Sequence, residues 1–313
     1  MDKFTKSVLN YLAGSVVLIF LLIYIYKQVS QQLSQAGVQS LNHHGPWLWL
    51  AGAFLLFFLN TSLEGLKWHM LVKLVSPTRY FNAFASYLCG ITFSVITPNR
   101  IGEYPGRILM LDKQNAFRYA NVSVLGILSQ LSAVYLYGFA GLLYFNIQFP
   151  TPIMQVALIF CLLVSVVWIW IYWKFESWLA LLERYRWLRR YINYGKLLKQ
   201  IPGKVQLTVF CISLVRFSLF TAQYLFLLRW MYVDVPIAGG FLTAALFFWT
   251  MAVTPSISLT EFGIRGSAGL YLFSHFSGNT IGILAATMLL WIVNLMVPAI
   301  FGSILIFRMK WIK

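Results

Sequence analysis

Long apolar runs alternate with short polar segments along the chain, and this pattern predicts membrane-spanning helices. A run of about 20 apolar residues crosses a hydrocarbon core of about 30 Å as a helix. The predicted full spans are residues 8–26, 47–66, 119–145, 153–173, 205–228 and 280–307. The first run follows Lys3 and Lys6 and shows no small-residue cleavage site, so we expect a retained span and no signal peptide.

Two further apolar runs, residues 80–96 and 241–253, end differently, because each meets a Thr-Pro pair and then a charged segment. The first region reads ITPNRIGEYPGR and the second VTPSISLTEFGIRG. In both, a glutamate follows the threonine and an arginine follows four residues later. Pro98 and Pro255 lie 157 residues apart, half the length of the chain. We therefore predict an internal repeat with halves 1–150 and 151–313, which together form a single transmembrane domain.

The basic residues predict how these segments lie in the membrane. If both termini are cytoplasmic and each Thr-Pro region is a re-entrant hairpin, the loops on the outer side hold only Lys27 and Arg229 of the 24 Lys and Arg. The other loop residues, including the basic loop 174–204, are then cytoplasmic, as the positive-inside rule requires. In this arrangement the first hairpin opens inward and the second outward. Oppositely oriented hairpins are typical of inverted-repeat transporters, whose substrate site lies between them.

Composition excludes a soluble protein, because 60% of the 313 residues are hydrophobic and 10% are charged, against about 25% charged in soluble domains. The net charge of +16 is compatible with nucleic acid or anionic lipid as a partner, and the hydrophobicity favours lipid. The aromatic and basic segment 183–199 is accordingly expected to lie on anionic headgroups. We predict an inner (cell) membrane protein with no nucleic-acid partner.

Cofactor and metal chemistry find little support in the sequence. The three cysteines lie in apolar runs without a CxxC pair, and the four histidines lack the spacing of metal ligands. A GxxxxGK[ST] phosphate loop does not occur either, so direct use of ATP is not expected. We predict no cofactor and no metal.

Charged side chains at membrane depth are the candidate site, because each costs about 3 kcal/mol at the bilayer centre and must face the protein interior. Glu103 and Arg107 are spaced i, i+4, as are Glu261 and Arg265, so each acid and base can pair on one helix face. The remaining candidate at the first hairpin is Arg100. The alternative is that each pair only stabilises its own hairpin.

The helix breaks are assigned to Thr97 with Pro98 and to Thr254 with Pro255, because proline cannot continue a helix. The next helix is expected to begin near each glutamate, with free N–H groups and an arginine converging on an anion. A phospholipid phosphate is the obvious anion. The glutamates are candidates to receive a cationic headgroup or to carry a coupling proton.

Two supporting charges lie outside the hairpins. Arg216 stands in the middle of an apolar run and needs a partner, for which Glu64 or a hairpin glutamate is expected. Glu64 itself lies near Lys67 at the expected inner end of the second span, where an interfacial salt bridge is the simpler interpretation.

The TPNRIGEYPGR motif around Glu103 and the TEFGIRG motif around Glu261 resemble the transmembrane region of lysylphosphatidylglycerol synthases, a flippase-like family. The similarity extends over nearly the whole chain. The resemblance implies a polytopic inner-membrane protein with re-entrant helices that moves a lipid between leaflets. The family's functional roles would fall on Arg100, Glu103, Arg107, Glu261 and Arg265. The synthases carry a soluble aminoacyltransferase domain after this region, whereas the sequence ends at Lys313, so we expect no synthase activity and a lipid made by another protein.

The sequence thus predicts an all-α membrane protein of six full spans and two re-entrant hairpins that moves a phospholipid or glycolipid across the bilayer. Its expected partners are lipids with an anionic or modified headgroup and a possible lipid-synthesising enzyme. The alternative is a non-transporting accessory subunit or a lipid-modifying enzyme of envelope glycolipid synthesis. We find no nucleophile or metal set that would support the enzyme.

Overall fold

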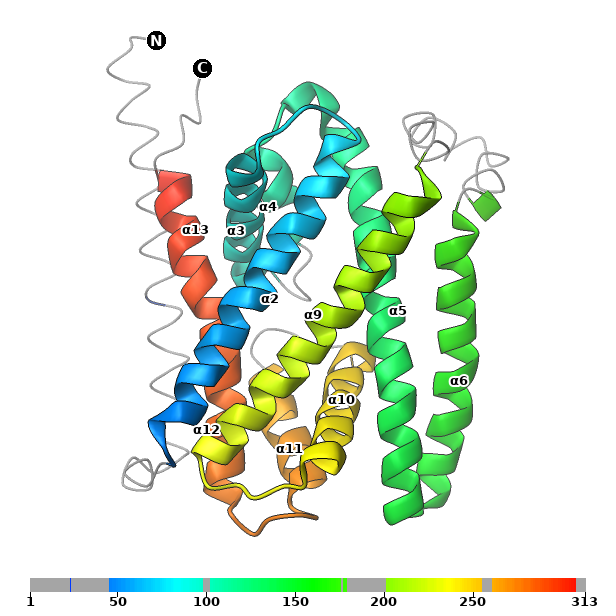
Figure 1. Cartoon of the computed structure of the whole chain (residues 1–313), viewed down its shortest axis with the longest axis vertical. Coiled ribbons are helices and arrows are strands. Elements are labelled where there is room, and N and C mark those ends of the chain that lie inside the picture. The colour runs from blue at the N-terminus through cyan, green and yellow to red at the C-terminus, as the bar shows by residue number, and fades with distance from the viewer. Residues whose placement is uncertain are drawn as a thin grey trace.

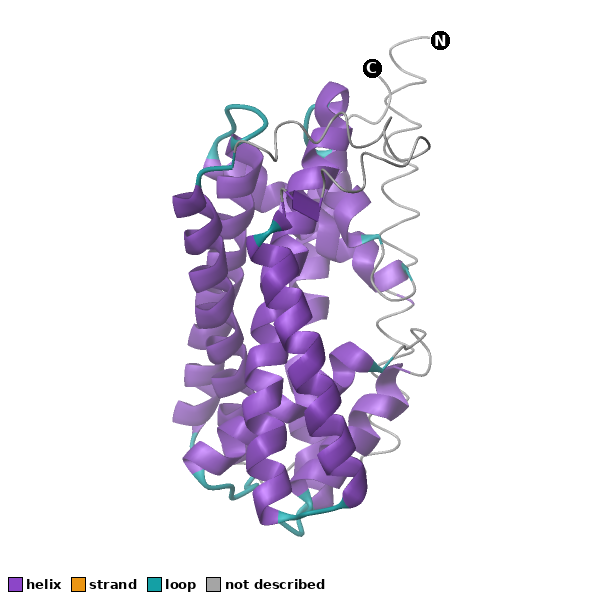
Figure 2. Cartoon of the chain, turned by 90° about the vertical axis from the view of Figure 1, so that its right-hand side faces the viewer, coloured by secondary structure: helices purple, strands orange, loops and turns teal. Residues whose placement is uncertain are grey.

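The computed structural model describes residue 23 and residues 45–97, 102–175, 177–178, 201–254 and 261–307, where every regular element is a helix (Figure 2). Five helical segments in these ranges are long and apolar enough to cross a membrane, and they run most of the length of the molecule (Figure 1). They are α2 (Trp47–Lys73), α5 (Ala116–Gln148), α6 (Pro152–Trp173), α9 (Gly203–Trp230) and the continuous segment α12 (Thr280–Trp291), η5 (Ile292–Met296) and α13 (Val297–Phe307). The predicted first span, 8–26, lies outside the described residues apart from residue 23, and so does most of the basic loop 174–204.

Apolar side chains cover the outside of this bundle, most plainly on α6. Only 11% of the most apolar 18-residue stretch of α6 is buried, and Ile153, Val156 and Leu163 are exposed. Exposing so much apolar area to water would cost about 25 cal/mol per Å², whereas in hydrocarbon the same surface carries no such cost. The expectation of an all-α polytopic membrane protein is confirmed.

The second span is longer than predicted, because α2 continues past Leu66 to Lys73. The prediction was wrong because the polar residues Glu64 and Lys67 suggested a membrane boundary. Both side chains are buried among other helices of the protein. Polarity in the sequence marks a membrane boundary only where the side chain faces outward.

Two pairs of shorter helices lie at opposite ends of the bundle (Figure 1). At one end α3 (Tyr80–Ile96) packs beside α4 (Glu103–Leu109), and the short η3 (Lys113–Asn115) leads on to α5. At the other end α10 (Ile237–Val253) packs beside α11 (Glu261–Phe273). The prediction that a new helix begins at the motif glutamate is confirmed for α4, whose first residue is Glu103, whereas the residues before Glu261 lie outside the described ranges.

The helix ends before the two prolines have the conformation that proline imposes on its predecessor. Thr97 and Thr254 are extended, with ψ of 140° and 113°. Thr97 also stabilises its turn, because Oγ1 donates to the Phe93 carbonyl at 2.9 Å and accepts from the Gly102 N–H at 2.8 Å. Pro98 and Pro255 themselves lie outside the described residues.

The helix contacts relate the two halves of the chain. The helix α2 packs on α9, while α3 packs on α13 and α10 packs on α5, so each hairpin lies against the last span of the other half. A hydrogen bond joins Lys67 on α2 to Gln130 on α5, and another joins Tyr224 on α9 to Thr287 on α12. Both positions of the second pair lie 157 residues after those of the first, the same interval that separates Pro98 from Pro255. This exchange of neighbours and this constant interval are what an internal repeat predicts.

Candidate functional site

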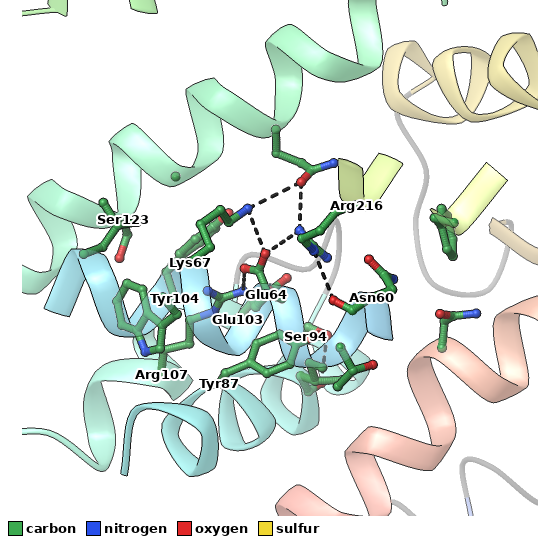
Figure 3. Close-up of a pocket in the computed structure, with 18 of the residues that line it drawn as sticks. Asn60, Glu64, Lys67, Tyr87, Ser94, Glu103, Tyr104, Arg107, Ser123 and Arg216 are labelled. Atoms are coloured by element: carbon green, nitrogen blue, oxygen red, sulfur yellow. Dashed lines mark hydrogen bonds and ion pairs between the residues drawn. The ribbon is translucent and has the colours of Figure 1, made fainter. Parts of the chain in front are cut away.

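A polar cavity of about 260 Å³ lies between α2, α3, α4, α5, α9 and η5 (Figure 3). It is unusual for the interior of a membrane protein in that charged groups line it from three separate helices. Its charged and polar lining residues are Asn60, Thr61, Glu64, Lys67, Tyr87, Ser94, Glu103, Tyr104, Arg107, Ser123, Gln130, Arg216 and Asn294.

One face of α2 supplies the largest share of this lining. Asn60, Glu64 and Lys67 follow one another at helical spacing, so their side chains share the face that turns away from lipid. The three residues are 8%, 5% and 3% exposed, respectively. The rest of α2 remains apolar enough to span the membrane, so the polar stripe is confined to the interior of the protein.

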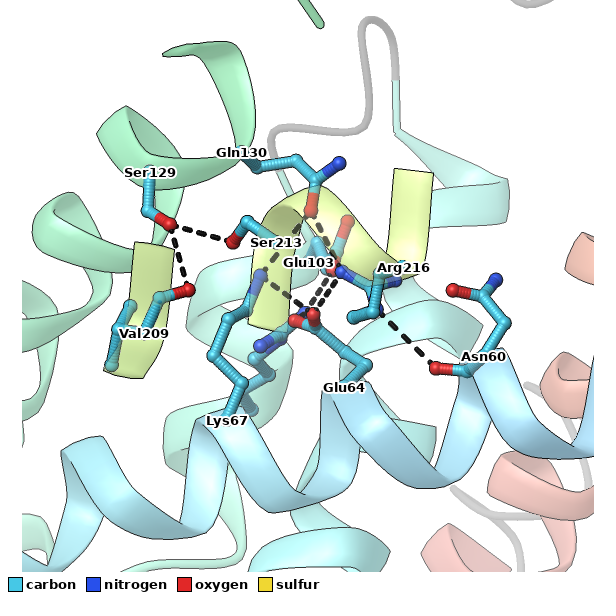
Figure 4. Close-up of polar contacts among 10 residues, drawn as sticks. Asn60, Glu64, Lys67, Glu103, Ser129, Gln130, Val209, Ser213 and Arg216 are labelled. Carbon is cyan, nitrogen blue, oxygen red and sulfur yellow. Dashed lines mark hydrogen bonds and ion pairs between the residues drawn. The ribbon is translucent and has the colours of Figure 1, made fainter. Parts of the chain in front are cut away.

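Glu64 is the centre of the charge network (Figure 4). Its Oε1 accepts from Arg107 Nη2 at 2.8 Å, and its Oε2 lies 2.7 Å from Lys67 Nζ and also contacts Arg216 Nη1. One carboxylate therefore meets cations from α2, α4 and α9. A buried charge is tolerated only when paired, so each of these helices is tied to the others through Glu64.

Arg107 reaches this carboxylate from the first hairpin. Its Nη2 also contacts Glu103 Oε1 at 2.5 Å, one turn earlier on α4, which confirms the predicted i, i+4 pair. The guanidinium carbon lies 5.2 Å from the Trp68 ring, 4.9 Å from Tyr87 and 5.6 Å from Tyr104. The rings exclude water from the cation and attract it through their π faces, so Arg107 is held in one position.

The helices α5 and α9 complete the wall beside α2. Gln130 Oε1 accepts from Arg216 Nη1 at 2.8 Å and from Lys67 Nζ at 3.4 Å. Close to this contact the hydroxyls of Ser129 and Ser213 lie 2.6 Å apart and join α5 to α9 (Figure 4). Gln130 and Arg216 are thus set on two helices that a separate buried hydrogen bond holds together.

Close packing of glycines brings α4 to the cavity. A Cβ added to Gly90 on α3 would lie 2.6 Å from the Glu103 carbonyl oxygen, and one added to Gly106 would lie 3.0 Å from the Gly90 Cα. A side chain at either position would push α4 away from α3. The GEYPGR motif therefore contains both the charges and the glycine that lets them enter the site.

The structure brings Glu64, Glu103, Arg107 and Arg216 of the predicted site residues together. The expected ion pairs of Glu64 with Arg216 and with Lys67 are confirmed. Glu64 is buried in the cavity wall, so the pair with Lys67 is not the exposed surface pair that the sequence suggested. The sequence analysis also placed Lys67 in the cytoplasmic loops and did not single out Asn60 or Gln130. The signal that could have found Asn60 and Lys67 is their shared helix face with Glu64.

The second hairpin contributes none of the described residues that line this cavity. Arg265 lies on α11 with its guanidinium carbon 5.9 Å from the Trp291 ring of α12. Glu261 is the first described residue of α11, but its side chain lies outside the described residues, as does Arg100 of the first hairpin. The functional roles of Arg100, Glu261 and Arg265 stay predictions.

Metal ligation is not supported where the structure is described, since these ranges hold no group of three or more His, Cys, Asp or Glu that could bind an ion. The described charged lining consists of three cations and two carboxylates. Chemically, such a lining is suited to bind a polar or charged group taken out of water.

Comparison with known protein families is decisive for the identity of the chain. The profile of the family described as lysylphosphatidylglycerol synthase TM region matches residues 11–302. The chain belongs to this family. The match to the lysylphosphatidylglycerol synthase transmembrane region includes both Thr-Pro motifs and every residue of the cavity lining, and it links the chain to lipid handling or synthesis in a membrane. No curated protein matches the chain.

Proposed function

We propose that this protein moves a membrane lipid between the two leaflets of the cell membrane, with the lipid headgroup in the cavity around Glu64. The observation that carries the proposal is the set of five charged side chains lining one cavity inside a bundle whose outside is apolar. Ionisable residues within a membrane protein cost free energy and typically mark a substrate pathway. The cavity, at about 260 Å³, is smaller than the about 300–1,000 Å³ of sites for drug-sized ligands, so it suits a headgroup while the acyl chains stay in the bilayer.

A purely structural role for these charges is weakened by the other half of the chain. There Tyr224 and Thr287 make the contact between α9 and α12 that corresponds to Lys67 with Gln130, and Thr221 stands 157 residues after Glu64. At these positions the second half joins α9 to α12 with neutral side chains. Because a buried ion pair gives little net stability over neutral packing, the charges of the first half are better explained by a ligand.

Transbilayer movement of headgroup-labelled lipids in proteoliposomes tests the function. We expect Glu103→Gln to slow the movement about tenfold, because a hydrogen bond to a charged group contributes about 1.5–3 kcal/mol and 1.4 kcal/mol is a factor of ten. Asp234→Asn is the matched control, since Asp234 pairs with Arg229 in an 86% exposed position outside the cavity. If no aminoacyl, glycosyl or plain phospholipid moves with the native chain, the accessory or enzymatic alternative is favoured.

The proposed membrane arrangement has both termini in the cytoplasm, the α3–α4 hairpin open to the cytoplasm and the α10–α11 hairpin open to the outside. Gln114 before α5 and Ser274 after α11 are exposed at opposite ends of the bundle, and each can be replaced by cysteine in a Cys211→Ser background. The remaining cysteines, Cys89 and Cys161, are buried. We expect a membrane-impermeant maleimide to label Ser274→Cys but not Gln114→Cys in intact cells. Labelling of both from the same side would contradict the inverted arrangement.

A further inference from the structure

The wall of the cavity formed by α2, α5 and α9 carries more positive charge than its partners neutralise. Lys67 and Arg216 share the same two acceptors, Oε2 of Glu64 and Oε1 of Gln130. Glu64 is shared in turn with Arg107, whose second partner is Glu103. Three cations and two carboxylates leave the described lining with one uncompensated positive charge. Burial in a medium of low dielectric makes such an excess unfavourable until an anion enters.

Asn60 adds an independent sign of a ligand on the same wall. Its side chain lines the cavity and is 8% exposed, yet Oδ1 is buried without a hydrogen-bond partner. Its backbone carbonyl accepts from Arg216 Nε at 3.3 Å, which places the residue beside the arginine (Figure 3). A buried polar atom left unpaired costs about 1–3 kcal/mol. The amide can turn to present either a donor or an acceptor, so it suits a group that carries oxygen atoms and hydroxyls.

We propose that Lys67, Arg216 and Asn60 form a binding site for a phosphodiester monoanion, and that the Glu64 carboxylate partly neutralises the two cations while the site is empty. A single negative charge brings the described lining to neutrality. A neutral headgroup would leave the excess positive charge in place, and a dianion would reverse its sign. The site therefore selects phosphodiesters over uncharged glycolipids and over phosphomonoesters, which carry about −1.5 to −2 at pH 7.

The physiological reading of this site rests on the proposed function, because a phosphodiester inside a membrane is most simply a phospholipid headgroup. The same chemistry is offered by a soluble phosphodiester or by free phosphate. Binding to the purified full-length protein in detergent separates these sources. The probes are dihexanoyl phosphatidylglycerol, its headgroup glycerophosphoglycerol without acyl chains, inorganic phosphate and uncharged dihexanoylglycerol.

We expect dihexanoyl phosphatidylglycerol to raise the Tm of the native chain with a saturable dependence on concentration, as any ligand specific for the folded state does. Dihexanoylglycerol at the same concentrations should give no more than the shift seen with detergent alone. Glycerophosphoglycerol binding as tightly as the lipid would keep the anion site and assign it to a soluble phosphodiester. Equal shifts from the phospholipid and from dihexanoylglycerol would overturn the proposal.

Gln130→Glu is the sharpest variant, because it adds a carboxylate between the two cations without removing any existing partner. It makes the described lining neutral, so we expect affinity for dihexanoyl phosphatidylglycerol to fall about tenfold while the folded yield is kept, one charged hydrogen bond being worth about that factor. Lys67→Met should lower the affinity by a similar factor. Lys73→Met is the matched control, since Lys73 is exposed on the same helix and should leave the affinity unchanged.

The two proposals fail in different ways. Lipid movement that continues in Gln130→Glu, together with unchanged affinity in that variant, refutes the anion site and leaves the carrier function standing. Selective binding that Gln130→Glu weakens about tenfold, in a protein that moves no lipid, supports the anion site and refutes the carrier.

Discussion

Glu64→Gln is expected to destabilise the folded protein more than any other single substitution in the cavity wall, by about 3–5 kcal/mol, the usual cost of removing one partner from a buried ionic network. The reason is that Glu64 is the contact point of Lys67, Arg107 and Arg216. Without its charge, three buried cations would share the single carboxylate of Glu103 among the described lining residues. Glutamine has nearly the same shape as glutamate, so the loss of stability in this variant measures the effect of removing the charge.

Glu103→Gln is the comparison for this prediction. Among the described residues Glu103 pairs with Arg107 alone, and its side chain is 21% exposed, so the loss of its charge should cost about 1.5 kcal/mol. Thermal unfolding of both variants in detergent free of anionic lipid gives the ranking by Tm. The role assigned to Glu64 fails if Glu64→Gln melts at or above Glu103→Gln. Added phosphatidylglycerol should restore only part of the stability lost in Glu64→Gln. Its phosphate would pair with Lys67 and Arg216, which contact Oε2 of Glu64, whereas Arg107 contacts Oε1.

The second large effect is expected where α5 meets the second hairpin. Gly141→Ala should lower stability by about 3 kcal/mol, the upper end of the usual cost of overpacking. A Cβ at Gly141 would meet the Leu242 carbonyl oxygen and lie 2.8 Å from the Leu246 amide nitrogen, both in the backbone of α10. Backbone atoms cannot rotate away as side chains do, so α10 would have to separate from α5.

The matched control for this substitution is Gly263→Ala on α11. Among the described residues nothing lies within 4 Å of a Cβ at Gly263, so this variant should be neutral or gain about 0.5–1 kcal/mol from the better helix propensity of alanine. Comparison of Tm and of folded yield in detergent tests the pair. Equal stability of the two variants would show that α5 and α10 are not in close contact in the folded protein.

Much of the fold follows from local properties of the sequence. Hydropathy alone predicted the span α6 to within one residue at its start. Most of the surface of this helix is apolar and exposed, so its polarity follows its sequence directly. The Thr-Pro pairs predicted where α3 and α10 end, because proline restricts its predecessor whatever surrounds it. The i, i+4 spacing predicted the Glu103–Arg107 pair, because both side chains lie on one short helix.

The candidate site followed from the sequence only in part. Glu103, Arg107, Glu64 and Arg216 were found because charges in apolar surroundings are costly and therefore conspicuous. Lys67 was misplaced because a lysine near the end of a span normally extends to the membrane surface, whereas here Glu64 and Gln130 hold it inside. Gln130 and Asn60 were missed because an uncharged polar residue in a span is not by itself a sign of a site.

By itself the sequence determined the membrane environment, the helical class, the positions of the helix breaks and the family, since each depends on residues close together in the chain. Only the tertiary structure decided that one carboxylate on α2 joins cations from α4 and α9, and that four of the five charged side chains of the cavity come from the first half of the chain. Arg107 and Arg216 lie 43 and 152 residues from Glu64 in the chain, and hydropathy gives the polarity of a segment without its neighbours. Which face of a helix meets which other helix is a property of packing, and that packing assembles the site.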